Sequence, residues 1–397
     1  MLELSIMDHG APYTEAVQTL LEQFQAERHC EVRLHIMPWR GAWAEFVRVA
    51  LYSDGPDVSE LGSTWVSEFV SMNALRPFVG ADITRIGGVA RFLPAAWSSS
   101  TPHSQQMPTL TWAIPWQADT RVLYYRRDIV ERAGIDPQTA FQTTTALKQT
   151  LAQLQAAGVP IPWVVPTRRS RMTLHNAASW VWGAGGDFVA LDRKRTTFME
   201  PPARAGFGAY FDLARHLAPS ARDLAELESD ELFWKGQAAV TVSGAWLLRA
   251  NSAAPEVLAN ASSTRLPGTA YVGGSHLGIW KHTRQPELAL SLVQFLANPT
   301  AQNIIFEKAG LLPTHLDVLT GETFARDPFY QVVSESLRLG RPFPPFTLWG
   351  LVENRLTEAL AAVWVEVLAT PEPDIAAVIE RHLGPVATRL DFTLSYQ

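Results

Sequence analysis

The sequence has one cysteine and no long apolar run, and each absence excludes a class of protein. Cys30 is the only cysteine among 397 residues, which excludes an internal disulfide, a Cys-ligated zinc site and a C-x-x-C redox pair. No run of about 18 apolar residues occurs, so no membrane-spanning helix is predicted. There is also no H-E-x-x-H motif and no phosphate-binding glycine loop after a strand, so we expect no metal and no cofactor.

Charged residues are scarce as well, at 18% against about 25% in a typical soluble protein. Lys and Arg total 33 against 39 Asp and Glu, so the net charge is −6. Such a chain offers no basic field to a phosphate backbone, and nucleic-acid binding is not expected. Apolar residues make up 47%, enough for the cores of two or three domains.

Tryptophan, in contrast, is abundant, with 14 residues. Burial is the first interpretation for those within apolar runs, which are Trp97, Trp112, Trp163, Trp182, Trp234, Trp280 and Trp364. Burial and ligand contact both stay open for those beside glycines or polar turns, which are Trp39, Trp180, Trp246 and Trp349. Few charges and many flat rings favour a neutral ligand with apolar faces.

The N-terminal part alternates between strand and helix patterns. Alternating apolar residues predict strands at 2–6, 32–36 and 57–62, and apolar residues at helical spacing predict helices at 12–24 and 39–50. Such alternation is typical of parallel βαβ units with right-handed crossovers.

The same patterns continue less regularly to the end of the chain. Further strands are predicted at 121–125, 163–165, 238–243 and 272–280, the last broken by Gly273 and Gly274. Further helices are predicted at 143–157, 172–182, 286–297, 300–309 and about 348–368.

Ligands of open α/β sheets bind outside the carboxyl ends of the strands, so the residues that follow the predicted strands are the candidate site. They are rich in aromatic, acidic and hydroxyl groups, which suit a sugar, because flat rings stack on its C–H faces and polar groups bind its hydroxyls. These candidates are Asp8, His9, Trp39, Arg40, Ser63, Thr64, Gly244, Trp246, Gly274, Ser275 and His276.

Four segments, in the same order along the chain, resemble the extracellular solute-binding proteins of sugar-importing ABC transporters. They are 55–65, 114–128 with 133–135, 233–239 with 243–246, and 295–302 with 310–314. Together they span most of the chain, and their order makes the resemblance specific.

The resemblance implies an α/β fold of the two-lobed periplasmic-binding-protein type (type II), similar to maltose- and trehalose-binding proteins. Each lobe would be a mostly parallel sheet flanked by helices, joined by hinge strands. One lobe would hold 1–115 and 273–318, and the other 116–268 and 319–397. The hinges would lie near 113–118, 268–273 and 313–320.

The resemblance also implies roles for individual residues. Asp119 matches the carboxylate that accepts sugar hydroxyls, and Trp246 matches an aromatic that stacks on the sugar after a Ser-Gly turn. Trp349 resembles another stacking aromatic. The family's first two loops contact ligand at the positions of Asp8, His9 and Arg40.

Two positions depart from the family pattern. Ser63 and Thr64 occupy a loop that often carries an acid in relatives, which predicts a weaker contact there. Ser275 and His276 follow the paired glycines, where relatives frequently have an aromatic, which leaves the stacking of one sugar ring undetermined.

The implied function is a substrate-binding subunit without catalysis. It would capture a small neutral oligosaccharide, a disaccharide or glucoside, by hinge closure and deliver it to the membrane permease subunits of an ABC importer. We expect a monomer outside the cytoplasmic membrane, in the periplasm or lipid-anchored. Its export signal and any anchoring cysteine would be missing from this sequence, since Cys30 lies inside the first predicted βαβ unit.

Two alternatives remain open. A glycoside-processing enzyme would use paired carboxylates about 5–10 Å apart, with Asp8, Asp57, Glu60 and Asp119 as candidates. A binding protein for a charged solute, such as an iron chelate or a polyamine, would need clustered tyrosines or an arginine nest, and neither is evident.

Overall fold

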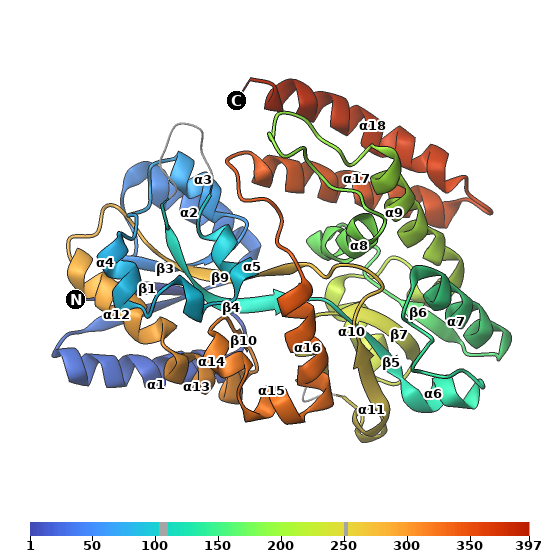
Figure 1. Ribbon diagram of the computed structural model, residues 1–397, viewed down its shortest axis with the longest axis horizontal. Coiled ribbons are helices and arrows are strands. Elements are labelled where there is room, and N and C mark those ends of the chain that lie inside the picture. Colours follow the sequence, from blue (N-terminus) through green and yellow to red (C-terminus); the bar gives the residue numbers. More distant parts are fainter. Residues whose placement is uncertain (103–109, 250–252, 397) are drawn as a thin grey trace. The chain divides into compact units, whose positions relative to one another are not determined.

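A computed structural model describes residues 1–102, 110–249 and 253–396 (Figure 1). The chain forms two compact units, each with its own sheet and helices. Unit 1 comprises Met1–Asp119, Val272–Arg326 and Pro342–Gly350. Unit 2 comprises Thr120–Tyr271, Asp327–Arg341 and Leu351–Gln397.

The strands are β1 (Leu2–Met7), β2 (Val32–Met37), β3 (Val58–Gly62), β4 (Ala113–Thr120), β5 (Val122–Arg126), β6 (Ile161–Val164), β7 (Ala238–Ser243), β8 (Ala261–Thr264), β9 (Val272–Ile279) and β10 (Leu312–Pro313). The α-helices are α1 (Ala11–Arg28), α2 (Trp39–Tyr52), α3 (Val66–Ser71), α4 (Gly80–Arg85), α5 (Pro94–Ser99), α6 (Arg127–Arg132), α7 (Thr144–Ala156), α8 (Arg171–Gly183), α9 (Pro201–Phe211), α10 (Glu226–Trp234), α11 (Pro255–Asn260), α12 (Pro286–Ala297), α13 (Pro299–Ala309), α14 (Leu316–Leu319), α15 (Glu322–Arg326), α16 (Pro328–Leu339), α17 (Trp349–Ala369) and α18 (Ile375–Leu394). The 3-10 helices are η1 (Val89–Arg91), η2 (Asp212–His216), η3 (Pro219–Ala221) and η4 (Ala245–Arg249).

The sheet of unit 1 has six strands in the order β10-β4-β9-β3-β1-β2. Strand β1 pairs in parallel with β2 and β3, so these three strands end at the same edge. Strand β9 pairs antiparallel with β3, and β10 pairs antiparallel with β4. The sheet is therefore mixed, which corrects the predicted mostly parallel lobe. The crossover rule fixes direction only for consecutive strands of one sheet, and β9 follows a long excursion through unit 2.

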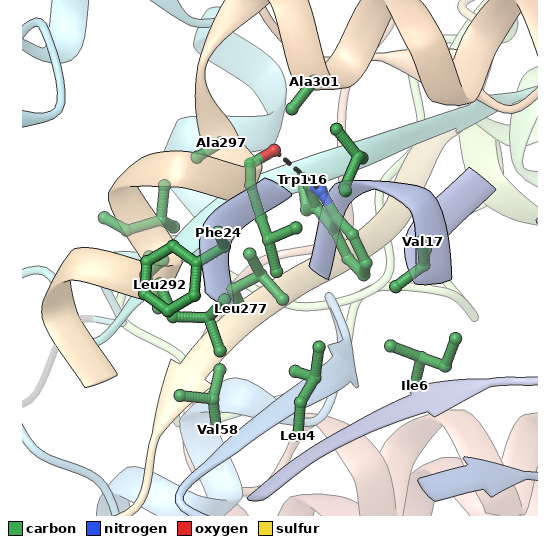
Figure 2. Packing of buried hydrophobic residues seen from close by; sticks show 14 of the residues in the cluster. Leu4, Ile6, Val17, Phe24, Val58, Trp116, Leu277, Leu292, Ala297 and Ala301 are labelled. Carbon is green, nitrogen blue, oxygen red and sulfur yellow. Dashed lines mark hydrogen bonds between the residues drawn. The ribbon is translucent and has the colours of Figure 1, made fainter. Parts of the chain in front are cut away.

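One core of unit 1 lies on the sheet face that α1, α12 and α13 cover (Figure 2). Leu4, Ile6 and Val58 point into it from the strands. Trp116 is fully enclosed there, and its Nε1 donates to the carbonyl oxygen of Leu296 at 3.1 Å. This bond satisfies the one polar atom that the indole brings into an apolar core.

A second core covers the opposite face of the same sheet. Met7 of β1 and Leu61 of β3 point into this second core. Their strand neighbours point to the other face, because successive strand residues alternate between the two faces. Phe46 of α2 and Phe69 of α3 pack there around Trp280. Helices therefore cover both faces, and the strand ends are the part of the sheet left for a ligand.

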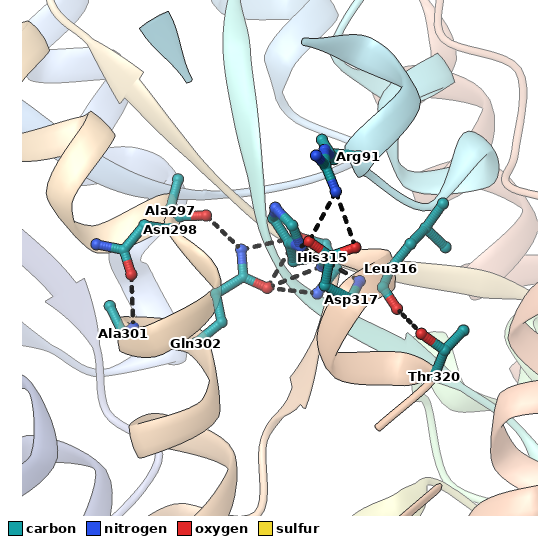
Figure 3. A network of polar contacts seen from close by, with 10 residues as sticks. Arg91, Ala297, Asn298, Ala301, Gln302, His315, Leu316, Asp317 and Thr320 are labelled. Atoms are coloured by element: carbon teal, nitrogen blue, oxygen red, sulfur yellow. Dashed lines mark hydrogen bonds and ion pairs between the residues drawn. The ribbon is translucent and has the colours of Figure 1, made fainter. Parts of the chain in front are cut away.

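A buried glutamine connects α13 to the chain after β10 (Figure 3). The Gln302 Oε1 atom accepts from the backbone N–H groups of Thr314 at 2.7 Å and His315 at 3.0 Å. Its Nε2 donates to the carbonyl of Ala297 at 3.2 Å, and the Thr314 hydroxyl donates to the carbonyl of Pro115 at 2.9 Å. These bonds hold β10 beside β4.

The sheet of unit 2 has four strands in the order β6-β7-β5-β8. Strands β6 and β7 are parallel, whereas β5 runs antiparallel to both β7 and β8. The mostly parallel sheet predicted for this lobe is thus corrected too, and the α/β class is confirmed for both units.

Several predicted helices are confirmed to within a residue or two. Helix α7 begins after Thr143, whose hydroxyl oxygen accepts from the N–H of Ala146 at 3.0 Å, and it ends just before Gly158. Helices α12 and α13 match the predicted ranges, whereas α18 was not predicted. Across the described residues, the structure contains no helix with the length and apolarity needed to span a membrane.

Candidate functional site

Unit 1 carries a polar and aromatic cluster at the carboxyl ends of its three parallel strands. Because β1, β2 and β3 end at one edge, the residues after them come together although they are far apart in the sequence. The three pairs are Asp8 and His9 after β1, Trp39 and Arg40 after β2, and Ser63 and Thr64 after β3.

Within this cluster, aromatic rings contact one another edge to face. The His9 ring centroid lies 5.5 Å from that of Trp39, which lies 5.7 Å from that of Trp65. Trp65 is buried and Trp39 is 41% exposed. The Trp39 ring therefore packs against a core residue on one side and is exposed to solvent on the other. The Trp39 ring is thus a platform for an apolar ligand face.

The start of α2 turns Trp39 and Arg40 outward. Gly41 has a φ of +95°, and Arg40 also has non-helical dihedral angles, so the regular helix forms only after this turn. A residue with a Cβ is disfavoured at such a φ, which explains the glycine. Both Trp39 and Arg40 are exposed, and the buried face of α2 begins at Ala42.

A buried carboxylate contacts this cluster through His9. Glu60 of β3 is fully buried, and its oxygens accept from the N–H of Met7 at 2.8 Å, the hydroxyl of Tyr13 at 2.9 Å and Nε2 of His9 at 3.0 Å. Burial alone would raise the pKa of Glu60. The charge and hydrogen bond of His9, together with the hydrogen bond from the N–H of Met7, hold the pKa below its usual value instead.

The predicted site residues of strand β9 pack against neighbouring elements of unit 1. The predicted break is wrong, because the strand runs unbroken through Gly273 and Gly274. Gly274 has a φ of +127°, and a Cβ there would lie 2.0 Å from the carbonyl oxygen of Gln117, so glycine permits a close approach to β4. Ser275 is buried, and its hydroxyl has no hydrogen-bond partner among the described residues.

The structure places His276, a predicted ligand contact, in the interior. Its ring is fully buried, with Nε2 at 2.9 Å from the Ser99 hydroxyl and 3.1 Å from the Ala96 carbonyl oxygen, both in α5. Strand residues alternate between faces, and helices cover both faces here, so the position after Ser275 points into the interior.

Unit 2 carries a second exposed aromatic ring after β7. Trp246 is 38% exposed, and its Nε1 donates to Oδ2 of Asp230 at 2.9 Å. The Arg121 guanidinium lies 5.0 Å from the ring centroid, within cation–π range. A Cβ on Gly244 would lie 1.8 Å from the indole, so the ring lies against this backbone. Gly244 is itself buried and supports the ring, and its ligand contact stays a prediction.

A series of polar and aromatic contacts holds Arg121 in place. It is 1% exposed, and its Nη2 donates to Nδ1 of His175 at 3.1 Å. The His175 ring stacks on Tyr271 with centroids 4.1 Å apart, and its Nε2 lies 3.6 Å from Oε1 of the buried Glu353. Because arginine can only donate, His175 Nδ1 is the acceptor.

The other predicted site residues have different surroundings. Trp180 is 3% exposed and packs edge to face on Tyr210 with centroids 5.1 Å apart, and its ligand contact stays a prediction. Trp349 is buried and stacks on Phe343 at 4.6 Å within unit 1. Asp119 lies half-buried near the end of β4. The ligand contacts of Trp349 and Asp119 stay predictions.

Burial divides the tryptophans, all of which lie within the described residues. Only Trp39 and Trp246 are exposed, Trp43 and Trp234 are half-buried, and the others are buried. The core prediction is confirmed for Trp97, Trp112, Trp163, Trp182, Trp280 and Trp364.

The sequence analysis does not identify four polar residues that hold the site residues in place, namely Tyr13, Arg121, His175 and Asp230. The signal for Arg121 was an arginine at the start of a β-prone run. Nothing local marked the other three, because each pairs with a residue far away in the sequence. In the described part of the chain, no group of three or more His, Cys, Asp or Glu side chains is arranged to hold a metal ion.

Two buried groups make opposite contributions to the pH dependence of folding. Burial lowers the pKa of His276 from 6.5 to about 4, so stability rises with pH across that window. Burial raises the pKa of Asp230 from 3.8 to about 6, so stability falls as pH rises from about 4 to about 6. Each shift corresponds to about 3 kcal/mol, and the two largely cancel.

We therefore expect Asp230→Asn to remove one of the two opposing contributions, so that the pH dependence due to His276 becomes measurable. The amide still accepts from Trp246, but the free energy of unfolding should increase by about 2 kcal/mol more than in the wild type between pH 4 and pH 6. Urea unfolding at several pH values measures this. Glu231→Gln, an exposed position on the same helix, is the control. Parallel pH profiles for Asp230→Asn and the wild type would contradict the assignment.

Comparison with known proteins places these two units in a family. Residues 10–303 match the family described as bacterial extracellular solute-binding protein. The chain is 22% identical over 369 residues to the diacetylchitobiose-binding protein DasA of Streptomyces coelicolor, covering 89% of this chain and 82% of that protein. It is 23% identical over 407 residues to the sn-glycerol-3-phosphate-binding periplasmic protein UgpB of Pectobacterium atrosepticum, covering 92% and 86%.

A solved structure agrees in fold. Maltose-bound MalE3 of T. maritima superposes with a TM-score of 0.81 at 22% identity, over 99% of this chain and 100% of that chain. The predicted α/β class of type II periplasmic binding proteins is thus confirmed. Since the family match covers most of its length, the chain belongs to the bacterial extracellular solute-binding proteins.

Proposed function

We propose that this protein binds a small neutral oligosaccharide, a disaccharide or glucoside, and delivers it to the permease subunits of an ABC importer. One observation carries the proposal. Each unit exposes one tryptophan at the carboxyl end of a strand, Trp39 in unit 1 and Trp246 in unit 2, while ten others are buried. A pair of flat rings beside hydroxyl, carboxylate and guanidinium groups suits sugar rings.

In this proposal the ligand joins two lobes by hinge closure. The lobes are those inferred from the family, 1–115 with 273–318 and 116–268 with 319–397, and the hinges lie near 113–118, 268–273 and 313–320. A ligand favours a closed state only through groups that it contacts in both lobes. The proposed contacts are Asp8, His9, Trp39, Arg40, Ser63 and Thr64 in the first lobe, and Asp119, Trp246 and Trp349 in the second.

The names of relatives support the chemical class. One relative is named for diacetylchitobiose, and a structure of the same fold holds maltose. Another is named for sn-glycerol-3-phosphate, so an anionic solute is the competing ligand. We propose a monomer that acts outside the cytoplasmic membrane, in keeping with the family description.

The proposal includes no catalytic step. Two carboxylates that could have paired for glycoside hydrolysis have structural partners. Asp57 accepts from the N–H of Glu3 at 2.9 Å and from the hydroxyl of Thr283, and Glu60 is buried. Incubating an oligosaccharide with the protein and finding released sugar units would overturn this part.

A thermal-shift screen tests the ligand class, because a ligand that binds only the folded state raises the melting temperature. The panel holds diacetylchitobiose, maltose, trehalose and sn-glycerol-3-phosphate. We expect at least one neutral sugar to raise the midpoint and the phosphate ester to leave it unchanged. A shift with the phosphate ester alone would contradict the proposal.

A further inference from the structure

The Glu60 carboxylate divides its two oxygens between different kinds of partner. Oε2 accepts from the Tyr13 hydroxyl at 2.9 Å and from the backbone N–H of Met7 at 2.8 Å, a donor that cannot reverse. Oε1 lies 3.0 Å from Nε2 of His9. The Tyr13 and His9 rings also touch edge to face, with centroids 4.8 Å apart, so the histidine ring is fixed on two sides.

The charge of Glu60 decides which nitrogen of His9 holds the proton. A carboxylate is only an acceptor, so Nε2 must donate, and a neutral His9 then has a lone pair on Nδ1. The Met7 N–H and the Tyr13 hydroxyl both donate to Glu60, the arrangement that an ionised carboxylate requires. The fixed side of His9 faces the interior, while 19% of its side chain is exposed beside Trp39.

We propose that Glu60 is a positioning residue that fixes His9 as the Nε2–H tautomer, so that Nδ1 accepts a hydrogen bond from a ligand hydroxyl. The ligand half of this statement rests on the proposed function. A lone pair at this position favours a hydroxyl donor and disfavours a phosphate or carboxylate oxygen. Glu60 would therefore help select neutral sugars over anionic solutes of similar size.

Glu60→Gln reverses the tautomer with little change in shape. The amide oxygen must replace Oε2, because that position receives two donors. The amide NH2 then replaces Oε1 and faces Nε2 of His9 as a donor. Nε2 becomes the acceptor, the ring proton moves to Nδ1, and a ligand hydroxyl loses its acceptor.

Nitrogen-15 NMR of histidine-labelled protein at pH 8.5, without ligand, reads the tautomer directly. His9→Gln assigns the His9 signals. We expect Nε2–H in the wild type and Nδ1–H in Glu60→Gln. Glu3→Gln is the matched control, because Glu3 forms a similar contact of 3.2 Å with His35 in the same unit, and it should leave His9 unchanged. A wild-type His9 that is Nδ1–H, or still doubly protonated at this pH, would overturn the proposal, and this spectrum is decisive even if the variant does not fold.

Calorimetry with diacetylchitobiose and maltose tests the ligand half. We expect Glu60→Gln to weaken the binding of whichever sugar the wild type binds by about tenfold, because the ligand hydroxyl loses its acceptor and must reverse to accept from Nδ1–H. A reversed tautomer with unchanged sugar affinity would overturn the acceptor role and leave the proposed function standing. If the wild type binds neither sugar, the ligand half is overturned together with the proposed function, while the NMR result still decides the role of Glu60.

Discussion

Trp246→Ala is expected to weaken sugar binding by about tenfold to a hundredfold. The indole is 38% exposed, and Asp230, Arg121 and Gly244 hold it in place, so no ordering is needed when a ligand stacks on it. Losing such an anchor costs about 1–3 kcal/mol of binding free energy. Isothermal titration with the sugar found in the thermal-shift screen measures the change.

Two further variants separate stacking from general damage. Trp246→Phe keeps a ring but loses the bond to Asp230, so its affinity should be intermediate. Leu191→Ala removes another exposed apolar side chain of unit 2, away from the strand ends, and should bind as the wild type does. Wild-type affinity in Trp246→Ala, with a folded protein, would remove Trp246 from the site.

Gly274→Ala should destabilise the fold by about 3 kcal/mol or more. The added Cβ would lie 2.0 Å from the backbone oxygen of Gln117, which cannot move without shifting β4. The φ of +127° is also unfavourable for any residue with a Cβ. Urea unfolding monitored by circular dichroism measures the loss.

Gly208→Ala is the matched control for this substitution. Gly208 lies in α9, and an added Cβ would meet no atom within 4 Å. Alanine is the better helix former, so this variant should gain about 0.5–1 kcal/mol. A Gly274→Ala protein as stable as the wild type would show that β9 and β4 do not approach as closely as described.

Local sequence patterns were sufficient for the elements but not for their pairing. Alternation at Leu2, Leu4 and Ile6 identified β1, and Gly158 marked the end of α7. The antiparallel direction of β9 depends on how the chain returns from unit 2, which no local pattern encodes. The sequence predicts a break at Gly274, whereas the glycine permits the close approach of β4, a strand that is distant in sequence.

The candidate site shows the same division. The positions of Trp39 and Trp246 directly after strands predict that both are accessible to a ligand, because helices cover the faces of such a sheet and leave the strand ends open. The burial of His276 and Trp180 depends on which helices cover each face of a sheet, which the local sequence does not indicate. Glu60 and His9 are 51 positions apart, so their contact exists only in the folded chain.

Small-angle X-ray scattering of the wild-type protein, with and without the sugar at saturation, tests most directly whether one ligand is held by both units. Closure about the sugar predicts a smaller radius of gyration in the bound sample, with the mass of a monomer in both. An unchanged radius of gyration in a sample that calorimetry shows to be saturated would contradict binding between the two units.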